Sequence, residues 1–187
     1  MITRQVDDIH HLVNEFSSFA RMPSPKLKIV NINKVVTDYI KPLISSFDDV
    51  TIELDKIIEN AFIMADEKQI RQACNNLIKN SYENITLNKI PDGNISISFG
   101  IENDFAFIKI SDNGTGIDKS ILSKIIEPYY TTKVGNSGLG LAITKKIIDD
   151  HNGSMLIKPL KNFRGTSVVF KFPLISKIKR EKINVKK

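Results

Sequence analysis

The sequence predicts a domain of the α+β class, a two-layer α/β sandwich in which helices cover one face of a mixed, mostly antiparallel sheet. Three observations favour this class. Apolar and polar residues alternate over 94–99 and 105–111, which is the pattern of half-buried strands. Apolar residues three and four positions apart within 66–84 indicate an amphipathic helix. The chain has 187 residues, 41% hydrophobic and 26% charged, enough for one sizeable core.

The first 22 residues are expected to form one helix of a bundle or coiled coil. Apolar residues recur at alternating spacings of four and three positions: Ile2, Val6, Ile9, Val13, Phe16 and Ala20. Fewer than three heptads are unstable alone, so this apolar seam requires partner helices, unless it packs against its own domain. Pro23 and Pro25 then make residues 23–26 a stiff linker.

Residues 27–175 are expected to form the folded domain. Strands are predicted at 27–31, 50–54, 61–64, 94–99, 105–111, 154–158 and 165–173. Turns are expected near 100–104 and 161–164. Besides 66–84, helices are predicted at 33–47, from about Asp118 to just before Pro128, and at 139–151, where Asn152-Gly153 ends the helix.

The helix over 66–84 is the element around which this domain is organised. Asp66 can cap its first turn, with Gln69 as the reciprocal partner of a capping box. One side carries the apolar residues Ile70, Cys74, Leu77 and Ile78, which should face the core. The other side carries amides four residues apart: Gln72, Asn76, Asn80 and Asn84. Buried amides without partners are costly, so this stripe should face a ligand or water, and an amide oxygen can join a Mg²⁺ shell balanced by phosphates. A solvated surface face is the alternative.

Bulk properties exclude several functional classes. Of the net charge of +6, residues 177–187 carry +5 (six basic, one acidic), which leaves +1 for the rest. This distribution favours a solvated basic tail over 176–187 and no nucleic-acid surface. One cysteine excludes a disulfide framework. No apolar run approaches the roughly 18 residues of a membrane span and no signal peptide is visible, so a cytoplasmic chain is expected.

Two glycine-containing segments are candidates for ligand binding. Asp112 stands at a predicted strand end and is followed by Gly114 and Gly116, so it can accept a hydrogen bond from an exocyclic amine such as that of adenine. An ordinary Asp-Asn-Gly turn is the alternative. Lys119 occupies the place of the third glycine of a dinucleotide fingerprint, which therefore fits poorly.

The second segment runs from Gly135 to Gly140 and opens the predicted helix at 139–151. Free N–H groups at a helix N-terminus bind phosphates, and Lys133 just upstream adds a full positive charge. The pattern lacks the Gly-Lys-Ser/Thr of a Walker loop, and a glycine-rich hinge is the alternative reading.

Taken in order, these segments resemble the ATP-binding domain of sensor histidine kinases, within the wider family of gyrase, mismatch-repair and heat-shock chaperone ATPases. The matching motifs are the N-box at Gln72–Asn80, the first glycine box at Asp112–Ile117, the F-box at Glu127–Lys133 and the second glycine box at Ser137–Ile143. His151-Asn-Gly153 and Gly165-Thr166 match the closing strands. The segment Glu15–Pro23 and the Glu-Pro-Tyr form of the F-box look most like NtrY-like nitrogen-regulatory sensors.

The resemblance implies a Bergerat ATP-binding fold with ATP and Mg²⁺ as cofactors. Asp112 would hold the adenine amine, Asn76 the phosphates and Asn80 the Mg²⁺. Residues 118–137 would form the ATP lid, and Lys133 with the amides of 138–140 would steady the phosphates. The ATP-binding residues implied are Asn76, Asn80, Asp112, Gly114, Gly116, Ile117, Thr132, Lys133, Gly138, Leu139 and Gly140.

Two departures from the family pattern bear on function. Asn136 stands where the second glycine box usually begins with glycine, although Asn tolerates a left-handed backbone. The family phosphorylates a histidine on the first helix of a hairpin, and residues 1–22 resemble only the second. Neither His10 nor His11 has the surroundings of an acceptor, and His151 is better explained by helix capping.

The resulting hypothesis is a catalytic domain that transfers the ATP γ-phosphate to a histidine on another chain. Implied partners are a second copy or a related chain bound through the N-terminal helix, an acceptor-histidine hairpin on another chain, and a response-regulator receiver domain. The alternatives are a truncated or split non-catalytic module for ATP binding or dimerisation and, less favoured by the NtrY-like helix, a serine kinase of the anti-sigma-factor branch.

Overall fold

A computed structural model describes residues 17, 21–44, 46–47, 49–55, 61–133, 136–160 and 165–176. Most of the helix expected over 2–20, both histidines in it, the turn at 161–164 and the basic tail from 177 onward lie outside the described residues. No helix in the part of the chain described here is long and apolar enough to cross a membrane.

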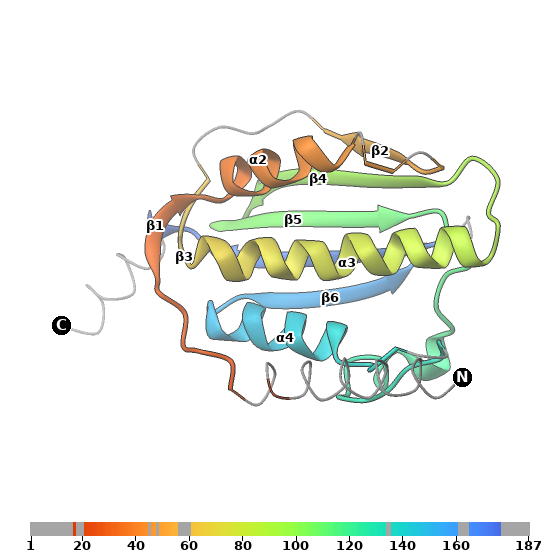
Figure 1. Cartoon of the computed structure of the whole chain (residues 1–187). Helices are drawn as coiled ribbons and strands as arrows, with labels where there is room; N and C mark the ends of the chain where they lie inside the picture. The colour runs from red at the N-terminus through yellow and green to blue at the C-terminus, as the bar shows by residue number, and fades with distance from the viewer. Residues whose placement is uncertain are drawn as a thin grey trace.

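Five strands form one mixed sheet in the order β2-β4-β5-β7-β6 (Figure 1). Their bounds are β2 Thr51–Leu54, β4 Asn94–Glu102, β5 Phe105–Asp112, β6 Ser154–Pro159 and β7 Thr166–Pro173. Only β2 runs parallel to its neighbour, β4; the other pairs are antiparallel. The predicted α+β class with a mostly antiparallel sheet is therefore confirmed. The sequence did not predict that β1 (Lys28–Asn31) and β3 (Phe62–Ala65) form a separate two-stranded sheet.

Three helices lie side by side over one face of the five-stranded sheet (Figure 1). They are α2 (Ile32–Ile44), α3 (Glu67–Leu87) and α4 (Gly140–Asp150), and α3 lies between the other two. The segment predicted as a short helix before Pro128 contains only a 3₁₀ helix, η1 (Lys119–Ile121), followed by turns.

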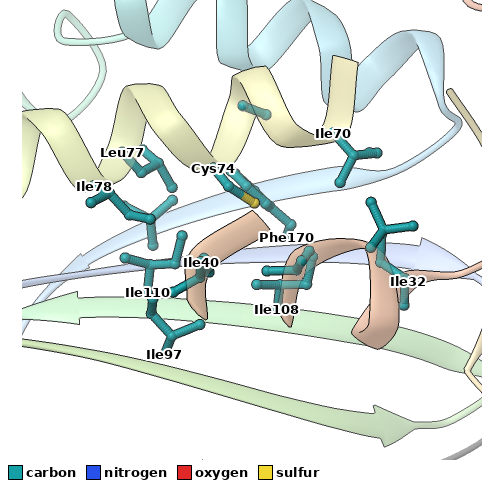
Figure 2. Packing of buried hydrophobic residues seen from close by; sticks show 14 of the residues in the cluster. Ile32, Ile40, Ile70, Cys74, Leu77, Ile78, Ile97, Ile108, Ile110 and Phe170 are labelled. Atoms are coloured by element: carbon teal, nitrogen blue, oxygen red, sulfur yellow. The ribbon is translucent and has the colours of Figure 1, made fainter. Parts of the chain in front are cut away.

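The core lies between this helical layer and the sheet (Figure 2). Because side chains alternate along a strand, every second residue of β4, β5 and β7 faces the helices and is buried. The predicted apolar side of α3, including Cys74 and Ile78, packs onto Ile97, Ile110 and Phe170 of these strands. Burial raises the pKa of the Cys74 thiol to about 12, so it acts as a small apolar side chain.

Two predicted boundaries shift for local reasons. β4 continues to Glu102, which pairs with Phe105, so the turn consists of Asn103 and Asp104 alone. Both have positive φ, 49° and 65°, as a tight hairpin turn that matches the strand twist requires. The helix predicted over 33–47 ends at Ile44, where the Ser46 N–H donates to the Leu43 carbonyl in a tighter last turn.

Candidate functional site

The start of α3 is fixed by a cap that only half matches the prediction. Asp66 accepts hydrogen bonds from the N–H groups of Lys68 and Gln69, as expected for an N-cap. The predicted reciprocal bond of a capping box does not form, so this part of the prediction is wrong: the Gln69 side chain donates to the Pro23 carbonyl at 2.9 Å instead. The Asp66 N–H has another partner, Nε2 of His151, at 2.9 Å.

The amide stripe of α3 divides into members with different environments. Gln72 is exposed and does not line the cavity described below, so it faces water, one of the two environments expected for this stripe. Asn76 donates to the Gly140 carbonyl at 3.2 Å and to the Thr144 hydroxyl at 3.3 Å, which ties α3 to α4. Asn84 accepts a hydrogen bond from the Thr115 hydroxyl.

Asn80 is the stripe member that is available for a ligand. Within the described residues its side-chain amide makes no hydrogen bond, and it lines the cavity. Its backbone carbonyl accepts a hydrogen bond from the Lys133 ammonium. An uncommitted amide oxygen at a cavity wall can accept from water or join the oxygen shell of a hard cation.

A cavity of about 350 Å³ lies between α3 and the segment that leads from β5 into α4. This volume falls in the range of small-molecule sites. All residues that the sequence implied for ATP binding line it except Gly114 and Leu139: Asn76, Asn80, Asp112, Gly116, Ile117, Thr132, Lys133, Gly138 and Gly140. The Gly114 N–H instead donates to Asp112 at 3.0 Å, and the Leu139 side chain is buried in the core.

Asp112 ends β5 at the cavity wall and is 7% exposed. Burial raises the pKa of its carboxyl group above the ordinary value, and hydrogen bonds from Gly114, Ser81 and Thr166 act in the opposite direction. The Ser81 hydroxyl donates to Oδ2 at 3.0 Å and the Gly114 N–H to Oδ1. These bonds hold the carboxylate in place, where its remaining lone pairs can accept from a ligand amine. Sequence reasoning missed the support from Ser81, which is the residue that directly follows Asn80.

Two glycines let backbone segments approach closely around the cavity. Gly165 has a φ of 144°, and a Cβ there would lie 2.0 Å from the Asp112 carbonyl oxygen. Gly138 has a φ of 69°, and a Cβ there would lie 2.7 Å from the carbonyl carbon of Tyr129. Only glycine fits both the left-handed backbone and these contacts. The absence of a side chain at Gly138 therefore lets the backbone of the second glycine box pack directly against the backbone of the F-box.

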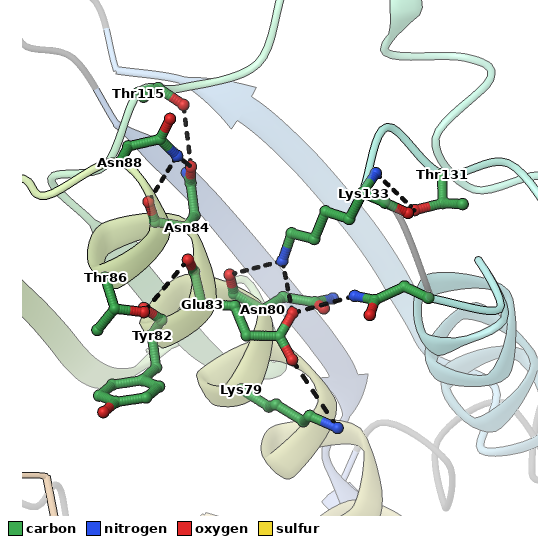
Figure 3. A network of polar contacts seen from close by, with 11 residues as sticks. Lys79, Asn80, Tyr82, Glu83, Asn84, Thr86, Asn88, Thr115, Thr131 and Lys133 are labelled. Carbon is green, nitrogen blue, oxygen red and sulfur yellow. Dashed lines mark hydrogen bonds and ion pairs between the residues drawn. The ribbon is translucent and has the colours of Figure 1, made fainter. Parts of the chain in front are cut away.

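A polar network joins α3 to the segment predicted as the lid (Figure 3). The Lys133 ammonium forms an ion pair with Glu83 at 2.8 Å, and the Asn136 amide donates to the same carboxylate oxygen at 3.1 Å. Burial alone would raise the pKa of Glu83, but the bond and charge of Lys133 and the bond from Asn136 lower it below the ordinary value.

Glu83 was not among the predicted site residues. The signal that could have found it is its place on α3, one turn after Asn80 and therefore on the same side of the helix. Its partners come from a segment about fifty positions later, which no local pattern connects to it.

The N-terminus of α4 opens at the same cavity, since Gly138, Gly140 and Leu141 line it. The first N–H groups of a helix have no partner within the helix and carry partial positive charge. Together with Lys133 they can bind an anionic group such as a phosphate.

The donor set fits a magnesium ion only in company with a ligand. The described residues contain no group of three or more His, Cys, Asp or Glu side chains that could hold a metal ion. The uncommitted oxygen of Asn80 is one ligand of the type that Mg²⁺ prefers, and the remaining oxygens would come from phosphates and water.

Comparison with known proteins decides the family. The model of the histidine kinase-, DNA gyrase B- and HSP90-like ATPases matches residues 65–176. The chain belongs to this family. It is 32% identical over 174 residues to an NtrY-like sensor histidine kinase of Rickettsia conorii, which covers 93% of this chain. The resemblance to the NtrY-like sensors is thereby confirmed.

Solved histidine kinases have the same fold. The catalytic domain of the histidine kinase ThkA is 26% identical, with a TM-score of 0.66 over 80% of this chain and 96% of that chain. A structure of ThkA in complex with the response regulator TrrA matches at a TM-score of 0.74 and 22% identity, over 92% of this chain and 49% of that chain. The residues described here thus contain a catalytic domain of the sensor histidine-kinase type. The chain spans about 28% of the length of the first curated relatives it matches.

Proposed function

We propose that residues 27–175 are the ATP-binding catalytic domain of a sensor histidine kinase, and that it transfers the γ-phosphate of ATP to a histidine outside residues 1–187. The observation that carries this proposal is the cavity. It combines a buried carboxylate, an uncommitted amide, an ammonium group and a helix N-terminus, contributed by four different parts of the chain. Such a set complements a ligand with an amine-bearing base and several phosphates.

Asp112 would recognise the adenine end of ATP. Its carboxylate is fixed by Ser81 and Gly114, so it can accept from the exocyclic amine with little reorganisation. Gly116 and Ile117 line the cavity after it and leave room for a flat base, and the apolar side chains of Ile125 and Val168 line the same cavity. Gly114 does not line the cavity but donates its N–H to the Asp112 carboxylate.

The phosphates would lie among α3, the lid and α4. Thr132, Lys133 and the backbone of 138–140 line the cavity there and would supply donors and positive charge. Asn76 would contact the phosphates only by exchanging its bonds to Gly140 and Thr144. Asn80 would hold a Mg²⁺ ion, which when bound neutralises phosphate charge. Phosphoryl transfer depends mainly on positioning and charge neutralisation, so this chain's own contribution is to orient the triphosphate and exclude water.

The remaining partners follow from the same proposal. Residues 1–22 would be the second helix of a dimerisation hairpin, joined by the linker 23–26, and would dock a second copy or a related chain. The acceptor hairpin would bring the histidine, and a response-regulator receiver domain would take the phosphoryl group. The complex of ThkA with TrrA supports this last partner by analogy.

The proposal is tested by incubating the chain with γ-labelled ATP and a separate acceptor hairpin from an NtrY-like relative. We expect acid-labile label on the hairpin, and none when Asp112→Asn replaces the parent. A hairpin without label, although the chain binds ATP, would reject histidine transfer. Acid-stable label would instead indicate a serine acceptor.

A further inference from the structure

Glu83 is an acidic residue beside a proposed binding site for a polyanion. Its negative charge is unfavourable for binding there unless other contacts of the carboxylate compensate. It projects from α3 one turn after Asn80 and lines the same cavity. Its carboxylate would repel a bound triphosphate by simple electrostatics. The contacts of Glu83 supply a reason that offsets this repulsion.

The carboxylate of Glu83 accepts hydrogen bonds from two side chains of the predicted lid. Oε2 accepts from the Lys133 ammonium at 2.8 Å and from the Asn136 amide at 3.1 Å (Figure 3). Lys133 also donates to the Asn80 carbonyl at 3.4 Å. The side chains of Glu83 and Lys133 are only 23% and 26% exposed, so water screens this pair less than a surface ion pair.

Lys133 keeps one donor for a ligand in this arrangement. An ammonium group has three N–H bonds, and among the described residues two of them go to Glu83 and to the Asn80 carbonyl. The third can reach a phosphate oxygen without breaking either bond. A lysine side chain that is already held in place loses less conformational freedom when the phosphate arrives.

We propose that Glu83 is a positioning residue that holds Lys133 and Asn136 of the lid beside Asn80, so that ammonium and amide meet the same phosphate. This inference rests on the proposed ATP site and adds a specificity element to it. Glu83 does not touch the nucleotide; it acts through Lys133. Its net effect is to favour ligands with several phosphates over the bare nucleoside.

Two mechanisms predict opposite signs for removal of the acid. If positioning dominates, Glu83→Ala weakens ATP and ADP by about tenfold, because the side chain of Lys133 must then be ordered during binding. If repulsion dominates, the same variant binds ATP more tightly. Adenosine affinity should stay unchanged in either case, whereas a merely structural role would weaken all three ligands together.

The experiment measures binding of ATP and ADP by calorimetry and of adenosine by ligand-detected NMR. Variants are Glu83→Ala, Lys133→Met and the double variant. We expect the loss caused by Glu83→Ala to disappear in the Lys133→Met background, since Glu83 acts through that side chain. Glu83→Gln, which keeps an acceptor oxygen, should recover part of the affinity. Asp38→Ala is the matched control, because Asp38 forms an ion pair with Lys34 on α2 at 2.7 Å, close to the 2.8 Å between Glu83 and Lys133.

A second measurement is independent of nucleotide. In the free protein, trypsin should cleave after Lys133 several-fold faster in Glu83→Ala than in the parent, while cleavage after Lys124 stays the same. Equal cleavage after Lys133, or ATP affinity that is unchanged or higher in Glu83→Ala, overturns the inference while the proposed function stands. If the parent binds no nucleotide, the proposed function fails and this inference falls with it.

Discussion

His151, at the end of α4, accepts a hydrogen bond through Nε2 from the backbone N–H of Asp66, at the start of α3, over 2.9 Å. Nε2 is therefore unprotonated, and Nδ1 carries the proton that it donates to the Ile147 carbonyl at 2.7 Å. The side chain is 2% exposed. One buried imidazole thus caps α4, as the sequence predicted, and also satisfies the N–H of the residue that caps α3.

Replacing His151 should destabilise the domain. His151→Ala removes the partner of the partly buried Asp66 N–H and leaves space beside Phe172, whose ring lies 6.5 Å from the imidazole. We expect the free energy of unfolding to fall by about 2–4 kcal/mol, measured by urea denaturation. Replacement of the exposed neighbour Asn152 by Gly is the control, since its φ of 54° favours glycine. Equal stability of His151→Ala and the parent would show that the bond contributes nothing.

Gly138 and Gly140 should respond in opposite ways to alanine. A methyl group at Gly138 meets the backbone of Tyr129 and Tyr130 at 2.7–2.9 Å with φ at 69°, so Gly138→Ala should lower stability by about 1–3 kcal/mol. At Gly140 the nearest atom is Asn80 Nδ2 at 3.8 Å and the backbone is helical. Gly140→Ala should therefore be neutral or stabilising by up to about 1 kcal/mol. Thermal unfolding of both variants checks the pair, and a similar loss in both would contradict this reading of the loop.

The buried carboxyl of Asp112 should make nucleotide binding depend on pH. Burial raises its pKa above the ordinary 3.8, so it takes up a proton at milder acidity than a free aspartate. A folded-state pKa above the unfolded value means that the group favours folding below the unfolded pKa and loses this contribution as pH rises through the folded pKa. The ionised form, which on the proposed function would accept from the adenine amine, therefore carries a stability cost at neutral pH.

We accordingly expect the affinity for ATP to fall as pH decreases through the raised pKa of Asp112. Protonation of this group should not lower the stability of the fold. Calorimetric titrations with ATP from neutral to mildly acidic pH would measure the change in affinity. Asp112→Asn should bind weakly at every pH and lack this dependence. An identical pH profile in parent and variant would assign the effect to another group.

Asn80 should account for the effect of magnesium on binding. Asn80→Ala is expected to reduce affinity for ATP about tenfold or more when Mg²⁺ is present, and to change it little when the ion is chelated. Asn75→Ala, an exposed amide on the other side of α3 that accepts from Tyr39, is the matched control. An equal loss with and without Mg²⁺ would mean that Asn80 contacts the nucleotide or supports the fold instead.

Local patterns in the sequence were sufficient for most of the fold. The helical spacing of Ile70, Cys74, Leu77 and Ile78 identified the buried side of α3, because side chains three and four apart share one face. Alternation over β4 and β5 identified their inner faces in the same way. These signals are carried by neighbouring residues and need no knowledge of partners.

The features that were missed depend on contacts between distant segments. Asp66 and His151 are 85 positions apart, and Glu83 and Lys133 are 50 apart. At the predicted capping box, Asp66 accepts from the Gln69 N–H as expected, but the return bond does not form: the Asp66 N–H donates to the distant His151, and the Gln69 side chain donates to the Pro23 carbonyl. Likewise, strand propensity cannot tell which strands pair, so the separate sheet of β1 and β3 was not predicted.

The most direct test of the account is calorimetry of the chain with Mg-ATP. We predict saturable binding of one nucleotide per chain, and a loss of at least about tenfold in affinity for Asp112→Asn, because the variant lacks the buried carboxylate proposed to receive the adenine amine. Absence of binding heat in the parent, or an Asp112→Asn variant that binds as the parent does, would contradict it.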